Sequence, residues 1–173
     1  MPDSPAPPTP FSPPVSVLFV CLGNICRSPM AEGIFLDLLE GDPRFEVDSA
    51  GTGSWHVGER PDPRARAVAE ENGIVLTSRG RQVTAEDLDR FHLVIAMDRA
   101  NLEALEGLRT RTGSVGSELR LLRTFDPEAD PHRDPRDLDV PDPYWDDDGF
   151  REVFAMLRRS LQTLLDHLED RLP

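Results

Sequence analysis

The chain has 173 residues with a formal net charge of −13, and 38% of its residues are hydrophobic. This length fits one domain that is large enough to bury a core. The negative charge argues against nucleic acid as a partner, because a polyphosphate would be repelled. Two cysteines allow only one disulfide, which disfavours a disulfide-stapled secreted scaffold.

Neither a membrane span nor an export signal is visible in the sequence. No apolar run approaches the ~20 residues that a membrane helix needs. The first residues, MPDSPAPPTPFSPP, have neither the basic start nor the apolar stretch of a signal peptide. We therefore expect a cytoplasmic protein with no membrane partner, present as a monomer or weak dimer.

The first half of the chain predicts alternating strands and helices. Residues 1–14 are rich in proline and predict a disordered leader, so that residues 15–173 would form one domain. Residues 15–20 are β-branched and apolar, as in a buried strand. A helix is then expected to open at Ser28 and Pro29, with Ser28 as its N-cap. Its buried stripe would comprise Ile34, Phe35, Leu38 and Leu39.

The alternation continues to the end of the chain. Strands are predicted at 45–50 and 91–97, and helices at 63–72, at 84–88, from 98, and at 149–168. Residues 117–122 remain ambiguous. The last helix carries apolar side chains on one face: Phe150, Val153, Phe154, Leu157, Leu161, Leu164, Leu165 and Leu168. Such a pattern predicts an α/β sandwich of three layers, a parallel sheet with helices on both faces.

The loop after the first strand has the composition of an anion cradle, and it reads Cys-Leu-Gly-Asn-Ile-Cys-Arg-Ser from residue 21 to residue 28. Amides at a helix N-terminus attract anions, and the fork of Arg27 can bind two phosphate oxygens. Gly23 and Asn24 tolerate a left-handed backbone. A helix N-terminus and a nearby arginine favour the thiolate of Cys21, to which Ser28 could donate. The alternative is a buried structural cysteine beside a surface arginine.

Cysteine chemistry also needs a proton for the leaving group. Asp142 is the candidate general acid, because prolines on both sides stiffen its loop. The aromatic residues Tyr144 and Trp145 can line a pocket there and exclude water. The alternative is an ordinary acidic surface loop, since the segment 126–148 holds many carboxylates.

The order and spacing of these motifs resemble the low-molecular-weight protein tyrosine phosphatase family over roughly residues 15–168. The resemblance rests on residues 21–32 and on Asp142 with Tyr144. Further matches are Asp48–Thr52, Trp55 with Gly58, 61–65, Arg81 with Gln82, and 96–98 with Asn101. It implies a four-stranded parallel sheet of the Rossmann-like, phosphotyrosine protein phosphatase I-like kind. It also implies hydrolysis of phosphotyrosine through a phosphocysteine, with no metal and no organic cofactor.

The resemblance implies a role for each matching residue. Cys21 would be the nucleophile, Arg27 the phosphoryl-binding residue, and Asp142 the general acid and then the base for water. The phosphate-binding loop would include Leu22, Gly23, Asn24, Ile25, Cys26 and Ser28. Asn24 would be held by Ser28 and Ser49. Walls for an aromatic ring would come from Leu22, Ile25, Trp55, Tyr144 and Trp145.

Three features are left open at this stage. Cys26 can form a protective disulfide with the nucleophile in this family, or it is a small loop residue whose amide alone matters. Ser78 stands where many eukaryotic relatives have a histidine. The loop 124–140 is long and acidic, which could change which peptides reach Asp142.

Rival functions divide on a few residues. Arsenate reductases of this fold need further cysteines, whereas this chain has only two. Protein-arginine phosphatases carry a smaller Thr where Ile25 stands and lack the aromatic pair 144–145. A metal site is disfavoured because the four histidines are dispersed, and each is expected to be a surface or packing residue. A thiol redox switch without phosphatase activity is a further rival function. Such a switch would not need Asp142, so this residue discriminates between the two functions. The expected partner is a phosphotyrosine protein, with a bacterial tyrosine kinase as one candidate.

Overall fold

The sheet of this protein has four parallel strands. The structure is a computed structural model that describes residues 10–173. Its strands are β1 (Val15–Cys21), β2 (Phe45–Gly51), β3 (Leu93–Ala96) and β4 (Glu118–Leu121). They are arranged in the order β2-β1-β3-β4, and all three pairings are parallel. The chain turns to opposite sides of β1 to form β2 and β3, so the strand order reverses at β1, where α/β folds bind ligands.

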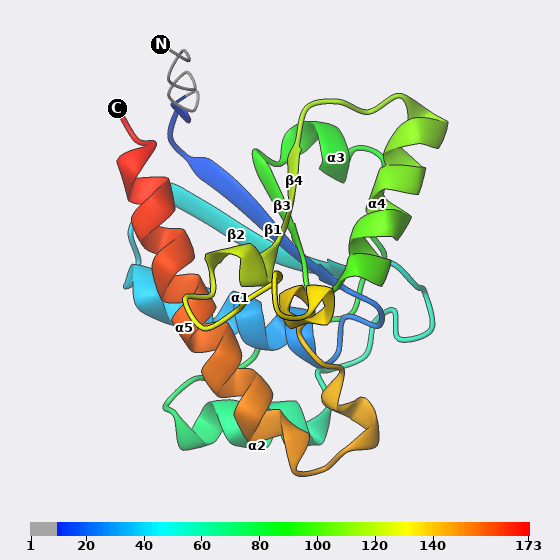
Figure 1. The fold of residues 1–173 in the computed structure, drawn as a ribbon, viewed down its shortest axis with the longest axis vertical. Coiled ribbons are helices and arrows are strands. Elements are labelled where there is room, and N and C mark those ends of the chain that lie inside the picture. Colours follow the sequence, from blue (N-terminus) through cyan, green and yellow to red (C-terminus); the bar gives the residue numbers. More distant parts are fainter. Residues whose placement is uncertain (1–9) are drawn as a thin grey trace.

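Helices cover both faces of the sheet (Figure 1). One face carries α1 (Arg27–Leu39), α2 (Pro63–Glu71) and α5 (Gly149–Asp170), and the other carries α3 (Asp87–Arg90) and α4 (Arg99–Thr112). Single 3₁₀ turns lie at Leu122–Phe125, Pro135–Leu138 and Pro143–Trp145. The predicted three-layer α/β sandwich is confirmed.

Strand β1 is the centre of the core because both of its faces are covered. Val17 and Phe19 pack towards α1 and α5, whereas Leu18 and Val20 pack towards α3 and α4. All seven residues of β1 are buried, as a central parallel strand requires. The eight apolar residues predicted for the last helix are all buried along α5. This rigid strand delivers Cys21 to the carboxyl edge of the sheet.

Three local features differ from the sequence-based expectations. The ambiguous segment forms the edge strand β4, which is only partly buried. Helix α3 begins at Asp87, later than predicted, although Thr84 and Asp87 exchange the expected reciprocal cap bonds. The predicted leader includes residues 1–9, which lie outside the described residues. At its end, Phe11 packs on the domain: its ring lies under the Arg171 guanidinium, and its amide donates to the Arg171 carbonyl.

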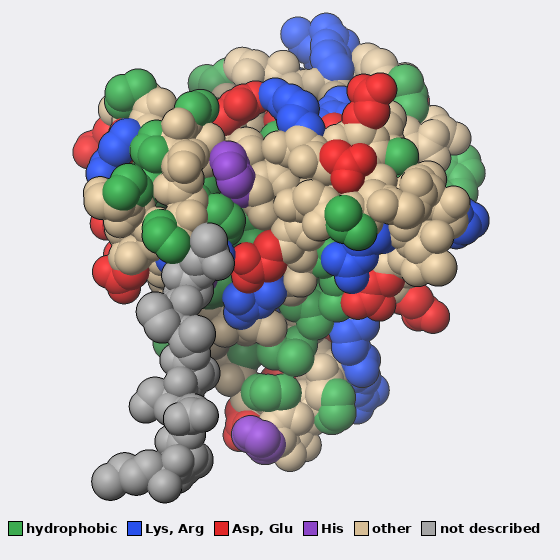
Figure 2. Space-filling model, turned by 90° about the horizontal axis from the view of Figure 1, so that it is seen from above, with side chains coloured by type: hydrophobic (Ala, Val, Ile, Leu, Met, Phe, Trp, Pro, Cys, Tyr) green, Lys and Arg blue, Asp and Glu red, His purple; other side chains and the backbone are tan. Residues whose placement is uncertain are grey.

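Most arginines lie beside a carboxylate at the surface. On the face in Figure 2, acidic and basic side chains lie next to one another in several places. Within residues 10–173, five arginines form no ion pair with a carboxylate: Arg60, Arg66, Arg79, Arg109 and Arg111. None of the helices in the described part of the chain has the length and apolarity that a membrane crossing needs.

Candidate functional site

Residues 21–28 connect the end of β1 to the start of α1, and we call them the phosphate loop after the role that the family resemblance implies. Asn24 has a φ of 56°, so it takes the left-handed conformation that tightens the curl. Gly23 does not have a positive φ, although both residues were expected to tolerate one. Helix α1 begins at Arg27 and no side chain caps it. The first amides of α1 therefore remain available to an anion.

The side chain of Asn24 fixes the shape of the loop. Its Nδ2 donates to Ser28 Oγ at 2.8 Å and to Ser49 Oγ at 3.0 Å. Its Oδ1 accepts the backbone amide of Arg81 at 3.0 Å. These are the contacts to Ser28 and Ser49 that the family resemblance implies, with a third one to Arg81. Asn24 is buried, so each bond also satisfies a group that would be costly to leave unpaired.

Cys21 lies at the base of the loop with its sulfur surrounded by donors. The amide of Asn24 donates to Sγ at 3.3 Å, and Ser28 Oγ lies 3.0 Å from the same sulfur. Asn24 already donates to Ser28 Oγ, so the single hydroxyl proton of Ser28 can point either at Sγ or at the Ala50 carbonyl oxygen, which lies 3.4 Å from Oγ. A thiolate has no proton to give, so in that form Ser28 must be the donor.

The prediction that Ser28 caps α1 is wrong. Cys26 is the N-cap residue, and Ser28 is the second residue of the helix. The hydroxyl faces Cys21 and Asn24, so it is used inside the loop and not at the helix terminus. Sequence alone favours Ser before Pro as a cap, because that pattern is common at ordinary helix starts.

Arg27 is buried, and one of its terminal nitrogens is fully engaged. Nη1 donates to Asp98 Oδ2 at 2.6 Å and to the Val140 carbonyl at 2.8 Å. Burial opposes the charge, but Cys21 and Asp98 outweigh it and raise the pKa of Arg27. Within residues 10–173, every hydrogen bond that this side chain donates starts from Nη1. The edge formed by Nε and Nη2 is therefore the one that can bind an anion in the loop.

Asp142 reaches the phosphate loop from a separate segment, as the residue before the 3₁₀ turn Pro143–Trp145. One carboxylate oxygen accepts the Tyr144 amide at 3.1 Å and so fixes the turn. The other lies 3.7 Å from Arg27 Nη2, and the side chain is 37% exposed. Asp142 thus reaches the arginine while remaining open to a ligand. The structure brings together Cys21, Arg27 and Asp142, which the sequence had placed up to 121 positions apart in a chain of 173 residues.

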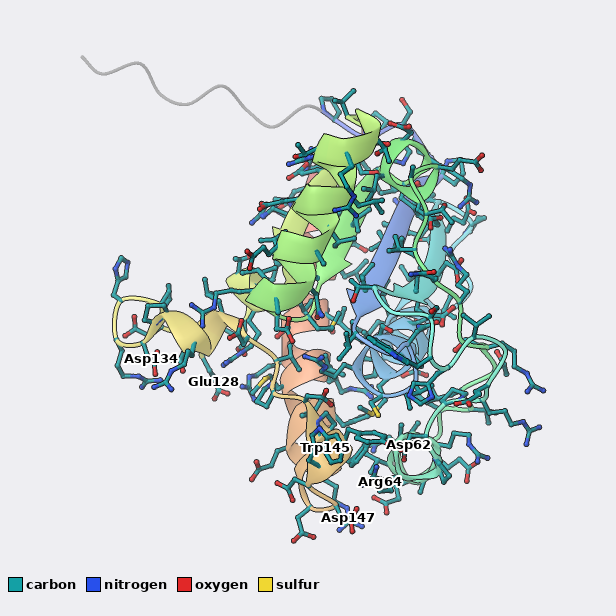
Figure 3. All side chains as sticks on the ribbon, turned by 90° about the vertical axis from the view of Figure 1, so that its right-hand side faces the viewer. Asp62, Arg64, Glu128, Asp134, Trp145 and Asp147 are labelled. Carbon is teal, nitrogen blue, oxygen red and sulfur yellow. The ribbon has the colours of Figure 1, made fainter. Side chains whose placement is uncertain are left out.

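A pocket of about 350 Å³ opens above the phosphate loop, hereafter the phosphate-loop pocket. The predicted wall residues all line it: Leu22, Ile25, Trp55, Tyr144 and Trp145. The rings of Tyr144 and Trp145 are perpendicular, with centroids 4.8 Å apart. Arg64 stacks over Tyr144 and pairs with Asp62 and Asp147, which ties α2 to the aromatic loop. Figure 3 shows Asp62, Arg64 and Trp145 close together at this end of the molecule.

Sequence reasoning missed three residues around the pocket. His56 was expected to be a surface or packing residue, but it lines the pocket and bonds Glu59. Its position directly after Trp55 was the available signal. Asp98 anchors Arg27, and Glu32 accepts from Ser49 at 2.9 Å, behind Asn24. Both matched the family pattern, yet only the fold shows what they contact.

The second cysteine of the loop differs from the first in its environment. Both thiols are free and buried. Burial, followed by the charge of Asp62, raises the pKa of Cys26 far above its ordinary value, so that sulfur stays a thiol. Cys26 also lines the pocket. A disulfide between Cys21 and Cys26 stays a prediction.

The acidic loop 124–140 is anchored at its base and lies away from the pocket. Asp126 is fully buried and pairs with Arg123 and Arg159, each at 2.9 Å. Figure 3 shows Glu128 and Asp134 on an arm that projects to the side, far from Trp145. The carboxylates at the tip of this arm are therefore not part of the pocket wall.

Replacement of Gly51 by alanine should distort the phosphate loop. A Cβ on Gly51 would lie 2.8 Å from the Leu22 carbonyl oxygen and 3.2 Å from the Asn24 amide, both of them backbone atoms. The loop would have to move, and displacement by ~1 Å can cost on the order of 10²-fold at such sites. We expect Gly51→Ala to weaken binding of inorganic phosphate, measured by calorimetry. Gly107→Ala is the control, since only the flexible end of Arg111 is nearby. Equal phosphate affinity in both variants would contradict the expectation.

Glu32 should make stability depend on pH. Burial is the main cause that raises the pKa of Glu32, and the charge of Asp48 adds to it, while the Ser49 bond opposes. A carboxyl whose pKa is raised by folding loses stability as pH rises from its unfolded value through its folded one. Glu32→Gln keeps an acceptor for Ser49 but cannot ionise. Denaturant titrations from pH 4 to pH 7 should therefore show the parent losing stability relative to Glu32→Gln. A constant difference over this range would rule this role out.

Comparisons with known proteins agree with the geometry. The model of the family described as "Low molecular weight phosphotyrosine protein phosphatase" matches residues 16–172. A low molecular weight protein-tyrosine-phosphatase of Streptomyces coelicolor is 44% identical over 86% of this chain and 90% of its own. The crystal structure of YfkJ from Bacillus subtilis has a TM-score of 0.79 at 36% identity, covering 90% of this chain and 95% of its own.

Solved structures of this fold also include a different kind of phosphatase. The Drosophila arginine phosphatase superimposes with a TM-score of 0.78 at 33% identity, covering 87% of this chain and 96% of its own. Fold alone thus does not separate the two kinds. The match of the family model over nearly the whole chain, together with the relative at 44% identity, is decisive for the family. This chain belongs to the low molecular weight phosphotyrosine protein phosphatase family.

Proposed function

We propose that this protein hydrolyses phosphotyrosine in proteins through a phosphocysteine intermediate. The observation that supports this most directly is the convergence of Cys21 Sγ, the Arg27 fork and the Asp142 carboxyl on one pocket. The pocket combines an anion cradle at its base with aromatic walls at its mouth. That combination suits a flat ring that carries a phosphoryl group.

The phosphate loop binds and orients the phosphoryl group. Amides at the start of α1 and the Nε–Nη2 edge of Arg27 surround the site where its oxygens would lie. Asp98 and the Val140 carbonyl hold the other nitrogen of Arg27, so the guanidinium is fixed before substrate binds. A fixed fork loses little entropy on binding and matches the charge that develops in the transition state.

In the first step, the Cys21 thiolate attacks phosphorus. The S–P bond forms while the bond between phosphorus and the tyrosyl oxygen breaks. A phenol has a pKa near ~10, so its oxygen leaves more readily when it is protonated. Asp142, which lines the same pocket as Cys21, supplies that proton.

In the second step, water releases the phosphate. The Asp142 carboxylate takes a proton from the water, whose oxygen attacks phosphorus as the S–P bond breaks. The electron pair returns to Cys21 as a thiolate, to which Ser28 donates from 3.0 Å. The free thiolate and inorganic phosphate close the cycle.

The walls favour tyrosine over arginine as the phosphorylated residue. Ile25 fills part of the pocket with a branched side chain, while Tyr144 and Trp145 present ring surfaces. A planar ring can stack on these surfaces. A guanidinium could donate to the Asp142 carboxyl, but it would bury other N–H groups against the apolar carbon of these walls.

The setting of the reaction is part of the same proposal. The partner would be a phosphotyrosine protein, with a tyrosine kinase as one candidate. We place the reaction in the cytoplasm, supported by two free thiols in one loop, which a reducing compartment preserves. The oligomeric state, a monomer or weak dimer, stays a prediction.

The mechanism predicts a graded response to substitution. Cys21→Ser should abolish turnover of p-nitrophenyl phosphate, and Asp142→Ala should lower kcat for phosphotyrosine by about 10²- to 10⁴-fold. The loss in Asp142→Ala should be smaller with p-nitrophenyl phosphate, because its more acidic phenol needs less protonation. Asp134→Ala, on the projecting arm, is the control and should match the parent. Full activity of Cys21→Ser, or equal losses on both substrates in Asp142→Ala, would refute the assigned roles.

Specificity can be tested through Ile25. The parent should give a higher kcat/KM for a phosphotyrosine peptide than for the matched phosphoarginine peptide. Ile25→Thr should narrow that ratio, because it removes apolar bulk and adds a hydroxyl that can pair with a guanidinium. Val57→Thr introduces the same hydroxyl on an exposed residue outside the pocket and should leave the ratio intact. A parent enzyme that prefers phosphoarginine would overturn the assignment of tyrosine.

A further inference from the structure

A second pocket, hereafter the arginine pocket, lies beside the loop that carries Trp55 and His56. Its volume is about 340 Å³. Three arginines line it, together with two hydroxyl residues and one carboxylate: Arg60, Arg66, Arg79, Thr77, Ser78 and Glu70. None of these side chains has a role in the mechanism proposed above.

The arginines of this pocket are exceptional in this acidic protein. Acidic residues number 32 against 19 basic ones, and most arginines find a carboxylate. Within residues 10–173, Arg60, Arg66 and Arg79 pair with none, although Glu70 lines the same pocket. Three guanidinium groups around one cavity repel one another, so their convergence leaves a local positive charge that an anion would relieve.

Backbone carbonyls hold two of these arginines without neutralising them. Arg66 Nε donates to the Pro61 carbonyl at 3.1 Å, and Arg79 Nη1 donates to the Gly58 carbonyl at 3.5 Å. A carbonyl restricts where the guanidinium lies but leaves its charge and its other N–H donors available. This is the state of an arginine prepared for a ligand oxyanion.

The loop 54–60 connects the arginine pocket to the phosphate-loop pocket. His56 lines the phosphate-loop pocket and Arg60 lines the arginine pocket. Four residues of chain span at most about 14 Å, so the Cα atoms of His56 and Arg60 lie no farther apart than that. Backbone bonds from Gly58 to Gly80 at 2.8 Å and from Gly80 to Glu59 at 2.9 Å hold the loop in place. An extended peptide covers this distance with about four to six residues.

We propose that the arginine pocket is a substrate subsite for a second oxyanion, a carboxylate or phosphoryl group on a side chain near the phosphotyrosine. This rests on the proposed function and adds a preference among phosphopeptides. Val75 and Leu76 also line the pocket and give the aliphatic part of such a side chain an apolar contact. The net charge of −13 repels acidic peptides at long range. The three arginines attract an oxyanion only at short range, within the pocket.

The test compares two matched double variants on two matched peptides. Arg60→Gln/Arg79→Gln removes two guanidinium groups from the pocket. Arg109→Gln/Arg111→Gln removes two other unpaired arginines, from α4, and so changes the net charge equally. The peptides carry one phosphotyrosine and either Glu or Gln at the same position, four to six residues away. KM for each pair is measured at low salt.

The parent and the α4 variant should bind the Glu peptide with a lower KM than the Gln peptide, by about fivefold. In Arg60→Gln/Arg79→Gln this ratio should fall close to one, while kcat stays the same. A ratio near one in the parent, or an equal loss in both variants, would overturn the subsite. Pyrophosphate should bind the phosphate loop of every variant. If it inhibits the parent more strongly than Arg60→Gln/Arg79→Gln and the parent shows no peptide preference, the arginine pocket binds a free anion, and a substrate side chain as the source of the oxyanion is overturned.

Turnover of p-nitrophenyl phosphate separates this inference from the proposed function. That substrate is too small to reach the arginine pocket, so all three proteins should hydrolyse it at the same rate. Absence of turnover in the parent would mean that the proposed function fails. Normal turnover without a peptide preference would mean that only the subsite fails.

Discussion

The hydrogen bonds of the Asn24 side chain are the constraint on which the rest of the site depends. A left-handed backbone costs most L-residues about 1–2 kcal/mol, and asparagine is one of the few that adopt it. The three bonds to Ser28, Ser49 and the Arg81 amide contribute roughly 1 kcal/mol each and outweigh that cost. The curl they hold places the Asn24 amide on the Cys21 sulfur. The position of the Cys21 sulfur, the shape of the loop and the floor of the pocket therefore follow from one buried amide side chain.

The sequence predicts the parts of this structure that depend on local patterns. Buried strands and the stripe along α5 follow from hydrophobic periodicity, because each element must hide one face or both. Cys21, Arg27 and Ser28 lie within eight residues, so a strand followed by a helix fixes their mutual arrangement almost completely. Asp142 and the aromatic walls come from another loop, and family resemblance was needed to connect them to the first.

What the sequence did not predict depends on contacts between distant segments. Asp98 reads as a helix cap, and it does cap α4 through Asn101, but only the fold shows its other oxygen on Arg27. Strand β4 was ambiguous because an edge strand buries little, so its residues show no clear alternation. Ser28 looked like a cap because the local rule ignores a sulfur that arrives from the preceding strand.

The segment 79–81 contributes both to the shape of the phosphate loop and to the charge of the arginine pocket. The amide of Arg81 holds Asn24, and the Arg81 side chain is neutralised by Asp48 and Asp87. Two positions earlier, the side chain of Arg79 has no carboxylate among the described residues and lines the arginine pocket. Gly80 between them must lack a side chain, since a Cβ there would lie 2.1 Å from the His56 carbonyl oxygen. Arg81 thus supports the structure of the loop, because two carboxylates neutralise its charge. Arg79 can bind a ligand anion, because no carboxylate among the described residues neutralises it.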